Sequence, residues 1–233
     1  MHGEGTMPAL AFGALSYDVA HLLDGAVLTL SFALLYQRRI TAVINIYALQ
    51  ALMLAAAAAW QGWVQDAWHL YLTAAIAVAA KGLIIPIALH RIVRRLEIHR
   101  SVETALGIFP SMAIGGGLVA LSIMVVLPTT LQAQAQTLTR EDLALALSVV
   151  LLGLLMMITR NNALTQVVGF MSLENGLILA AVGAVGMPLI VELSVAFLVL
   201  VAFIVFGVFF FRIRDRFDSL DVSHLDALGE TRL

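Results

Sequence analysis

The sequence predicts an all-α membrane protein, a bundle of about seven transmembrane helices. Of its 233 residues, 61% are hydrophobic and 12% are charged, and the mean hydropathy is +0.98. A soluble domain is about half apolar and a quarter charged. Apolar runs of about 20 residues, long enough to cross a bilayer, recur along the chain. Basic residues recur in every second connection between these runs, as in a multi-pass protein.

The seven expected spans are residues 17–36, 40–60, 70–89, 106–127, 143–159, 164–187 and 189–211, followed by a polar tail at 212–233. Six spans are the alternative, if the first run lies at the membrane interface. The fifth span follows Thr139-Arg140-Glu141-Asp142, which resembles a helix-capping box. We therefore expect a single integral membrane domain.

The basic residues indicate the orientation of the bundle. They follow the first, third, fifth and seventh expected spans: Arg38, Arg39, Arg91, Arg94, Arg95, Arg100, Arg160, Arg212, Arg214 and Arg216. Positive connections stay in the cytoplasm. The N-terminus is therefore expected outside and the C-terminus in the cytoplasm.

Cysteine usage and net charge exclude several classes of site. The chain has no Cys, which excludes disulfides, Cys-type zinc sites and Cys-ligated iron–sulfur clusters within it. Its net charge of −2 gives no indication of nucleic-acid binding. We expect no metal and no cofactor in this chain.

Glu174 lies about halfway along the sixth expected span, beside Asn175. A carboxylate at that depth costs roughly 2.5–3.5 kcal/mol on insertion scales. It can be a group that pins helix packing, or a proton-exchanging group that faces the bundle interior. We favour the second reading, with Asn175 helping to hydrate the site or hydrogen-bond to it.

Lys81 presents the same problem near the middle of the third expected span. An ammonium group there is too deep to reach the interface with ease. A fixed ion pair with Glu174 or with an acid of a partner subunit is one reading. A lysine that changes its charge in a proton path is the other. Glu174 and Lys81 are the two proton-path candidates.

Three glycines recur every seven residues around Glu174: Gly169, Gly176 and Gly183. At about 100° per residue they fall on one stripe of the helix, while Glu174 projects from a different face. Small residues let a second helix approach closely. We interpret the stripe as a helix-packing surface.

Weaker polar candidates occur in other spans. Asp18, His21 and Asp24 lie in the outer half of the first span and could form a proton entry or exit, or simply a hydrated helix end; they are too spread for a metal site. Asn45 and Gln50 are expected to be buried amides that hydrogen-bond between helices. Glu192 lies close to the outer end of the seventh span and is expected to be solvated.

Several of these segments together resemble one known family, hydrogenase-4 component E. They are Leu173-Glu174-Asn175-Gly176, preceded by Arg160-Asn161-Asn162 and Gly169-Phe170; Lys81 followed by Gly82-Leu83-Ile84-Ile85-Pro86; and the tail from Leu220-Asp221-Val222 to Ala227-Leu228. The segment around Glu174 is also similar to the K-type small membrane subunit of respiratory complex I. It is similar as well to the matching subunit of multisubunit cation/proton antiporters.

The resemblance implies a non-catalytic membrane-arm subunit of a complex-I-like assembly in the prokaryotic cytoplasmic (inner) membrane. Its partners would be antiporter-like and quinone-site-type membrane subunits and a cytoplasmic hydrogenase-like arm. That arm would carry iron–sulfur clusters and typically a nickel–iron centre. One departure is that the seventh span lacks the second mid-membrane glutamate of the K-type subunit, since Glu192 lies too near its end. Glu174 would then exchange with Lys81 or with a neighbouring subunit.

Two other functions fit the same buried charges. One is a subunit of a cation/proton antiporter without a redox partner. The other is a purely structural scaffold in which Lys81 and Glu174 form a locked pair.

Overall fold

A computed structural model describes residues 6–95, 106–132 and 137–183 of the chain. In these ranges the protein is an all-α bundle, as predicted. Its helices are α1 (Thr6–Tyr36), α2 (Ile40–Val64), α3 (Trp68–Ile76), η1 (Ala77–Ile84), α4 (Ile85–Arg95), α5 (Ile108–Gln132), α6 (Thr137–Thr159) and α7 (Ala163–Gly183). The predicted span 189–211, including Glu192, and the tail 212–233 lie outside the described residues.

Six stretches of the described helices are long and apolar enough to cross a membrane: Ser16–Tyr36, Ile40–Val64, Trp68–Arg94, Ile108–Val126, Glu141–Thr159 and Ala163–Gly183. The third of them runs through α3, η1 and α4 without a break. Each stretch overlaps one of the first six expected spans. The chain is therefore a multi-pass membrane protein by the length and composition of its helices.

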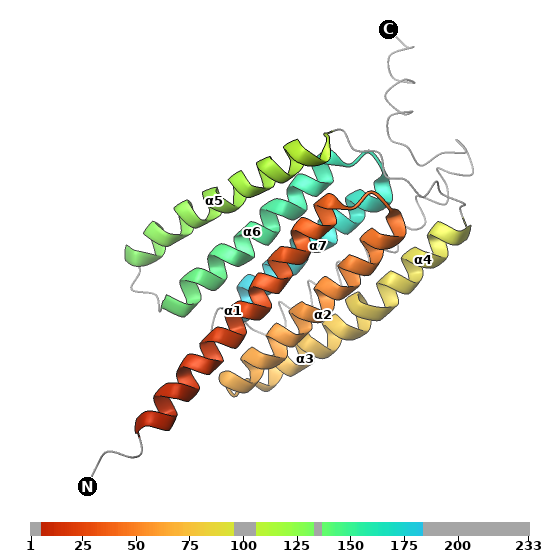
Figure 1. Cartoon of the computed structure of the whole chain (residues 1–233). Helices are drawn as coiled ribbons and strands as arrows, with labels where there is room; N and C mark the ends of the chain where they lie inside the picture. Colours follow the sequence, from red (N-terminus) through yellow and green to blue (C-terminus); the bar gives the residue numbers. More distant parts are fainter. Residues whose placement is uncertain (1–5, 96–105, 133–136, 184–233) are drawn as a thin grey trace.

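The long helices run side by side, and consecutive spans run in opposite directions (Figure 1). α1 packs against α2, α5 and α6, whereas α7 packs against both α6 and α2. The continuous span α3–η1–α4 packs against the other side of α2. This arrangement brings residues of α1, α2, η1 and α7 together near the middle of the bundle.

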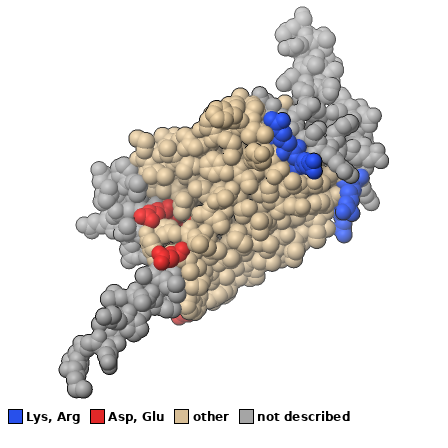
Figure 2. All heavy atoms as spheres, viewed as in Figure 1, with Lys and Arg blue, Asp and Glu red and all other residues tan. Residues whose placement is uncertain are grey.

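The described charges separate to opposite ends of the bundle (Figure 2). The exposed arginines Arg38, Arg39, Arg91 and Arg94 lie at one end, which we call the basic end. The exposed acids Asp18, Asp66 and Glu141 lie at the other, the acidic end. The positive-inside rule predicts that such a basic end faces the cytoplasm.

Glycines allow a close contact between α6 and α7. A Cβ added to Gly176 would lie 2.8 Å from the backbone nitrogen of Val150, and one added to Gly169 would lie 3.1 Å from the carbonyl oxygen of Gly153. Gly153 itself fits against the backbone of Leu173, and Gly183 against the side chain of Asp142. The glycine stripe of α7 therefore lies on α6, which leaves the face of Glu174 free to meet other helices.

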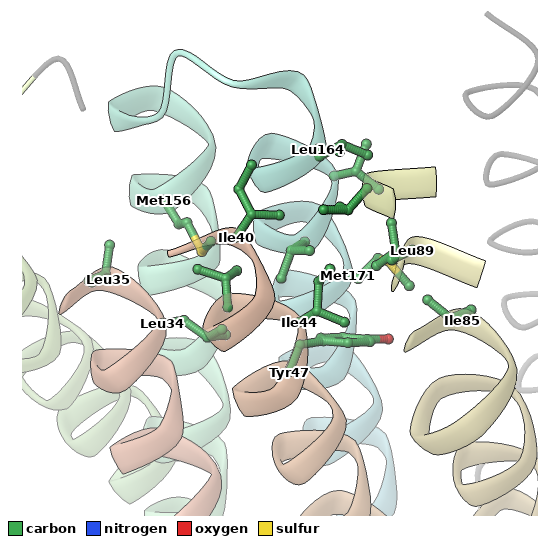
Figure 3. Close-up of a cluster of buried hydrophobic side chains, with 14 of the residues drawn as sticks. Leu34, Leu35, Ile40, Ile44, Tyr47, Ile85, Leu89, Met156, Leu164 and Met171 are labelled. Carbon is green, nitrogen blue, oxygen red and sulfur yellow. The ribbon is translucent and has the colours of Figure 1, made fainter. Parts of the chain in front are cut away.

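Large apolar side chains fill the half of the bundle nearer the basic end. They include Leu34, Ile40, Ile44, Tyr47, Ile85, Leu89, Leu164 and Met171, and they come from α1, α2, α4 and α7 (Figure 3). The half nearer the acidic end has smaller clusters that are rich in Ala and Val. We call the cluster of large side chains nearer the basic end the basic-half plug. It separates the middle of the bundle from the basic end.

Candidate functional site

Lys81 lies in η1, a π-helical segment within the third span. The amide of Ile85 donates to the carbonyl oxygen of Ala80, five residues back instead of four. Pro86 follows directly and has no N–H to give to an α-helical ladder. π-helical turns are rare and occur frequently at functional sites. The altered register accompanies the placement of Lys81 inside the bundle, where the residue is only 3% exposed.

Lys81 forms a buried ion pair with Glu174. Its Nζ lies 2.9 Å from Oε2 of Glu174, and both side chains are buried. The contact is an ion pair by distance, but neither carboxylate oxygen of Glu174 accepts an aligned hydrogen bond from the described residues. Two opposite charges that are buried together offset much of each other's desolvation cost. The two candidates that the sequence placed in different spans therefore belong to one site.

A chain of amides and hydroxyls extends from the pair. Nζ of Lys81 donates to Oδ1 of Asn175 at 2.9 Å, and Nδ2 of Asn175 donates to Oε1 of Gln50 at 3.2 Å. Nε2 of Gln50 donates to the hydroxyls of Ser31 (2.8 Å) and Ser172 (3.0 Å). We call these five residues, together with Glu174, the mid-depth network.

The hydrogen bonds of this network all run in one direction, away from Lys81. An ammonium group can only donate, so Asn175 must turn its oxygen toward Lys81 and its nitrogen toward Gln50. Gln50 must then donate onward, and the Ser31 hydroxyl donates to the carbonyl oxygen of Val27 at 3.0 Å. The order of donors is therefore set by the charge on Lys81, and it extends toward the acidic end.

Two polar groups on the basic side of the network lack such connections. The hydroxyl of Tyr47 is fully buried and has no hydrogen-bond partner among the described residues; it points toward the α4 side of the basic-half plug (Figure 3). Arg160 lies in the connection between α6 and α7, as expected, and is 2% exposed. Its Nη2 donates to the carbonyl oxygens of Leu34 (2.9 Å) and Leu35 (2.7 Å) at the end of α1. Burial, with a smaller effect of the nearby Arg38, lowers the pKa of Arg160 to about 10.

A second polar group, the acidic-end cluster, joins α1 to α6. It consists of Tyr17, His21, Asp24, Glu141 and Asp142. Nε2 of His21 lies 3.1 Å from Oε2 of Glu141, and Nδ1 lies 3.3 Å from Oδ1 of Asp142. The Tyr17 hydroxyl donates to Oε2 of Glu141 at 2.8 Å. The carboxyl groups of Asp24 and Asp142 lie within hydrogen-bonding reach of each other, and both residues are buried.

The structure corrects two predictions. Asn45 is exposed, not buried, because it lies five residues from the buried Gln50 and so about 140° around α2. The capping box at Thr139 is also wrong, because α6 already begins at Thr137 and a capping residue must have a non-helical backbone.

The acidic-end cluster contains His21 and Asp24 as candidates, whereas Asp18 is exposed on α1. Sequence reasoning missed Asp142, Glu141 and Tyr17 as members of the cluster. The available signal was that Asp142 lies near the start of an otherwise apolar span, like Asp24 in the first. Ser31 and Ser172 were also missed, since a single serine in an apolar helix gives no signal of its partner.

One relative supports a family assignment. The chain is 32% identical over 211 residues to the Uncharacterized protein Rv0085 of Mycobacterium tuberculosis (strain ATCC 25618 / H37Rv), covering 89% of this chain and 93% of that protein. The chain belongs to the family of that protein. No family model and no solved structure matches it. The name of that protein states no activity.

The chemistry available to the described residues is proton exchange. No group of three or more His, Cys, Asp or Glu side chains in the described ranges could hold a metal ion. The buried acids and the buried lysine of the described residues all belong to the Lys81–Glu174 pair or to the acidic-end cluster. Both lie inside helices that are apolar elsewhere, where each charge is costly.

Proposed function

We propose that the protein is a membrane-arm subunit of a complex-I-like, membrane-bound hydrogenase assembly of the hydrogenase-4 or formate hydrogenlyase type. In this role it holds part of the membrane arm together and contributes Lys81 and Glu174 to proton translocation. The observation that carries the proposal is the buried pair, 2.9 Å from Nζ to Oε2, at the middle of two membrane-spanning helices. The resemblance of the chain to hydrogenase-4 component E implies the partners. They are antiporter-like and quinone-site-type membrane subunits and a cytoplasmic arm with iron–sulfur clusters and a nickel–iron centre.

The pair suits proton exchange because each partner controls the charge of the other. Protonation of Glu174 removes the negative charge that stabilises the ammonium of Lys81 in an apolar interior. Lys81 then depends on Asn175, whose Oδ1 it already contacts at 2.9 Å. A change in the charge of a neighbouring subunit would shift the proton affinity of the whole pair, because coupled groups titrate together.

The surroundings of the pair support access from one side. The mid-depth network continues toward the acidic end through Gln50 and Ser31. Toward the basic end the side chains of the basic-half plug leave no comparable chain of hydrogen bonds among the described residues. We propose that in this conformation the pair exchanges protons with the acidic side.

The first experiment identifies the assembly. The full chain is tagged in its native membrane, extracted in mild detergent, and its partners are identified by mass spectrometry and metal analysis. We expect antiporter-like membrane subunits together with iron–sulfur subunits and nickel. Membrane subunits that come without a redox arm would favour the antiporter function instead. Purification of this chain alone would contradict the proposal.

The second experiment tests the role of Glu174 in inverted membrane vesicles. Glu174→Gln keeps the shape of the side chain but cannot ionise, so we expect proton pumping to be lost while the assembly and its redox activity remain. Asp66→Asn, in an exposed turn, is the matched control and should pump normally. Normal pumping by Glu174→Gln would favour the structural scaffold.

A further inference from the structure

His21 bridges two carboxyl groups that differ in exposure. Its Nδ1 faces Asp142, whose side chain is 5% exposed, and its Nε2 faces Glu141, whose side chain is 48% exposed. The ring nitrogens of a neutral imidazole are one donor and one acceptor, and they exchange roles when a proton enters at one and leaves at the other. The ring is thus placed between a buried acid and an acid in contact with solvent.

The buried side of this bridge is a pair of carboxyl groups. Asp24 on α1 and Asp142 on α6 are 5% and 4% exposed, and their carboxyl groups lie within hydrogen-bonding reach of each other. Ionised carboxylates can only accept hydrogen bonds, so a bond between two carboxyl groups requires a proton on one of them. Two like charges that share one buried site also resist ionising together. Oδ1 of Asp142 and Nε2 of His21 are both buried, and neither has an aligned hydrogen bond among the described residues, so the contacts of His21 with the two acids are ion pairs by distance.

Apart from His21, the described side chains of the neighbouring helices supply no cation to replace that proton; the side chain of Arg140, which precedes Glu141 on α6, lies outside the described residues. α2 (Ile40–Val64) and α5 (Ile108–Gln132) contain no Lys, Arg, Asp, Glu or His, and α7 contains only Glu174, at mid-depth. On α1 the facing groups are Tyr17, His21 and, more distantly, the exposed Asp18; on α6 they are Glu141 and Asp142. Among these described groups, His21 alone can carry a positive charge.

We propose that Asp24 and Asp142 hold one shared proton and that His21 relays it to Glu141 at the acidic surface. On release, the proton leaves the carboxyl pair for Nδ1 of His21, and the proton on Nε2 passes to Glu141 and then to water. On uptake, the same transfers run in reverse. One proton enters and one leaves at each step, so no other reactant is needed.

The carboxyl pair and the mid-depth network share one face of α1. Asp24 and Ser31 are seven residues apart on α1, which places them on the same face at a separation of roughly 10 Å. The hydroxyl of Ser31 already accepts from Gln50. The destination of the proton at Glu174 rests on the proposed function, whereas the shared proton itself does not.

Infrared difference spectroscopy on the purified assembly tests the shared proton. Subtracting the spectrum of Asp24→Asn, or of Asp142→Asn, from the wild type at neutral pH should leave the band of a protonated carboxyl group, which shifts in deuterated water. Asp18→Asn, on the exposed face of the same helix, is the control and should leave only ionised carboxylate bands. Ionised bands alone in both pair variants would overturn the proposal. This readout holds even if Glu174→Gln shows that the chain does not pump.

Chemical rescue tests the relay separately. His21→Ala should slow pumping at least about tenfold, the lower part of the range for a lost proton-transfer group, and imidazole added on the acidic side should restore it. Size-exclusion chromatography of the assembly checks that the variant is folded. An unchanged rate would overturn the relay. A slow rate that imidazole does not restore would also overturn it, because the role of His21 would then be structural. If Glu174→Gln abolishes pumping but His21→Ala gives one of these two results, the relay is refuted and the proposed function still stands.

Discussion

The mid-depth network and the acidic-end cluster both place polar side chains inside an apolar bundle, but they are balanced in different ways. The network pairs opposite charges, Lys81 with Glu174, and passes its hydrogen bonds on through amides. The cluster gathers three acids around one histidine. Opposite charges can stay ionised together, whereas like charges in one site must keep a proton. The buried acid of the network is therefore balanced by a buried cation, whereas the two buried acids of the cluster have only His21 beside them among the described residues.

The largest expected effect on stability is the loss caused by removing the charge of Lys81 from the network, compared with removing that of Asp24 from the cluster. Lys81→Met should lower the free energy of unfolding in detergent by about 3–5 kcal/mol, because Glu174 is left buried without a counter-charge. Asp24→Asn should cost much less, since it relieves crowding between two acids. Denaturant titration of both variants measures the contrast. The double variant Lys81→Met with Glu174→Gln should recover most of the loss, and equal losses in Lys81→Met and Asp24→Asn would contradict the comparison.

A second prediction concerns the glycine contact that sets α6, which carries Asp142, against α7, which carries Glu174. A Cβ at Gly153 would lie 2.5 Å from the backbone nitrogen of Leu173. Gly153→Ala should therefore cost about 3 kcal/mol, at the upper end for overpacking. The control is Gly116→Ala, whose Cβ would meet nothing within 4 Å; alanine there should be neutral or stabilise α5 by about 0.5–1 kcal/mol. Equal free energies of unfolding for the two variants would contradict this prediction, because α6 and α7 would then tolerate a side chain between them.

The smallest of these effects should come from the amide that links the network toward the acidic end. Gln50→Leu removes the partner of Asn175 and the donor to Ser31 and Ser172, so we expect a loss of about 1–2 kcal/mol in unfolding free energy. Asn45→Leu is the control on the same helix, because Asn45 is exposed. A change below about 0.5 kcal/mol, typical of exposed positions, is expected for the control. If both variants unfold alike, the network does not hold these helices together.

The sequence by itself determined the class of fold and identified the charged residues whose burial in the membrane is costly. The apolar segments, and the arginines in every second connection between them, follow from the cost of placing polar or charged groups in a bilayer. This cost depends on each residue separately, so it can be judged from the sequence. The same cost marked Glu174 and Lys81 as exceptional positions. The spacing of Gly169, Gly176 and Gly183 predicted a packing face because helical periodicity is local.

The tertiary structure alone decided which of these residues meet. Lys81 and Glu174 are 93 positions apart, and no local pattern states that η1 and α7 face each other across the interior. The rotation of α2 decided that Gln50 joins the network while Asn45 turns outward. The packing of α6 against α1 brought Asp142 to His21 and Asp24, and so turned a residue at the start of a helix into half of a carboxyl pair. Contacts between helices depend on how the helices rotate and pack, and that is settled only when the whole bundle assembles.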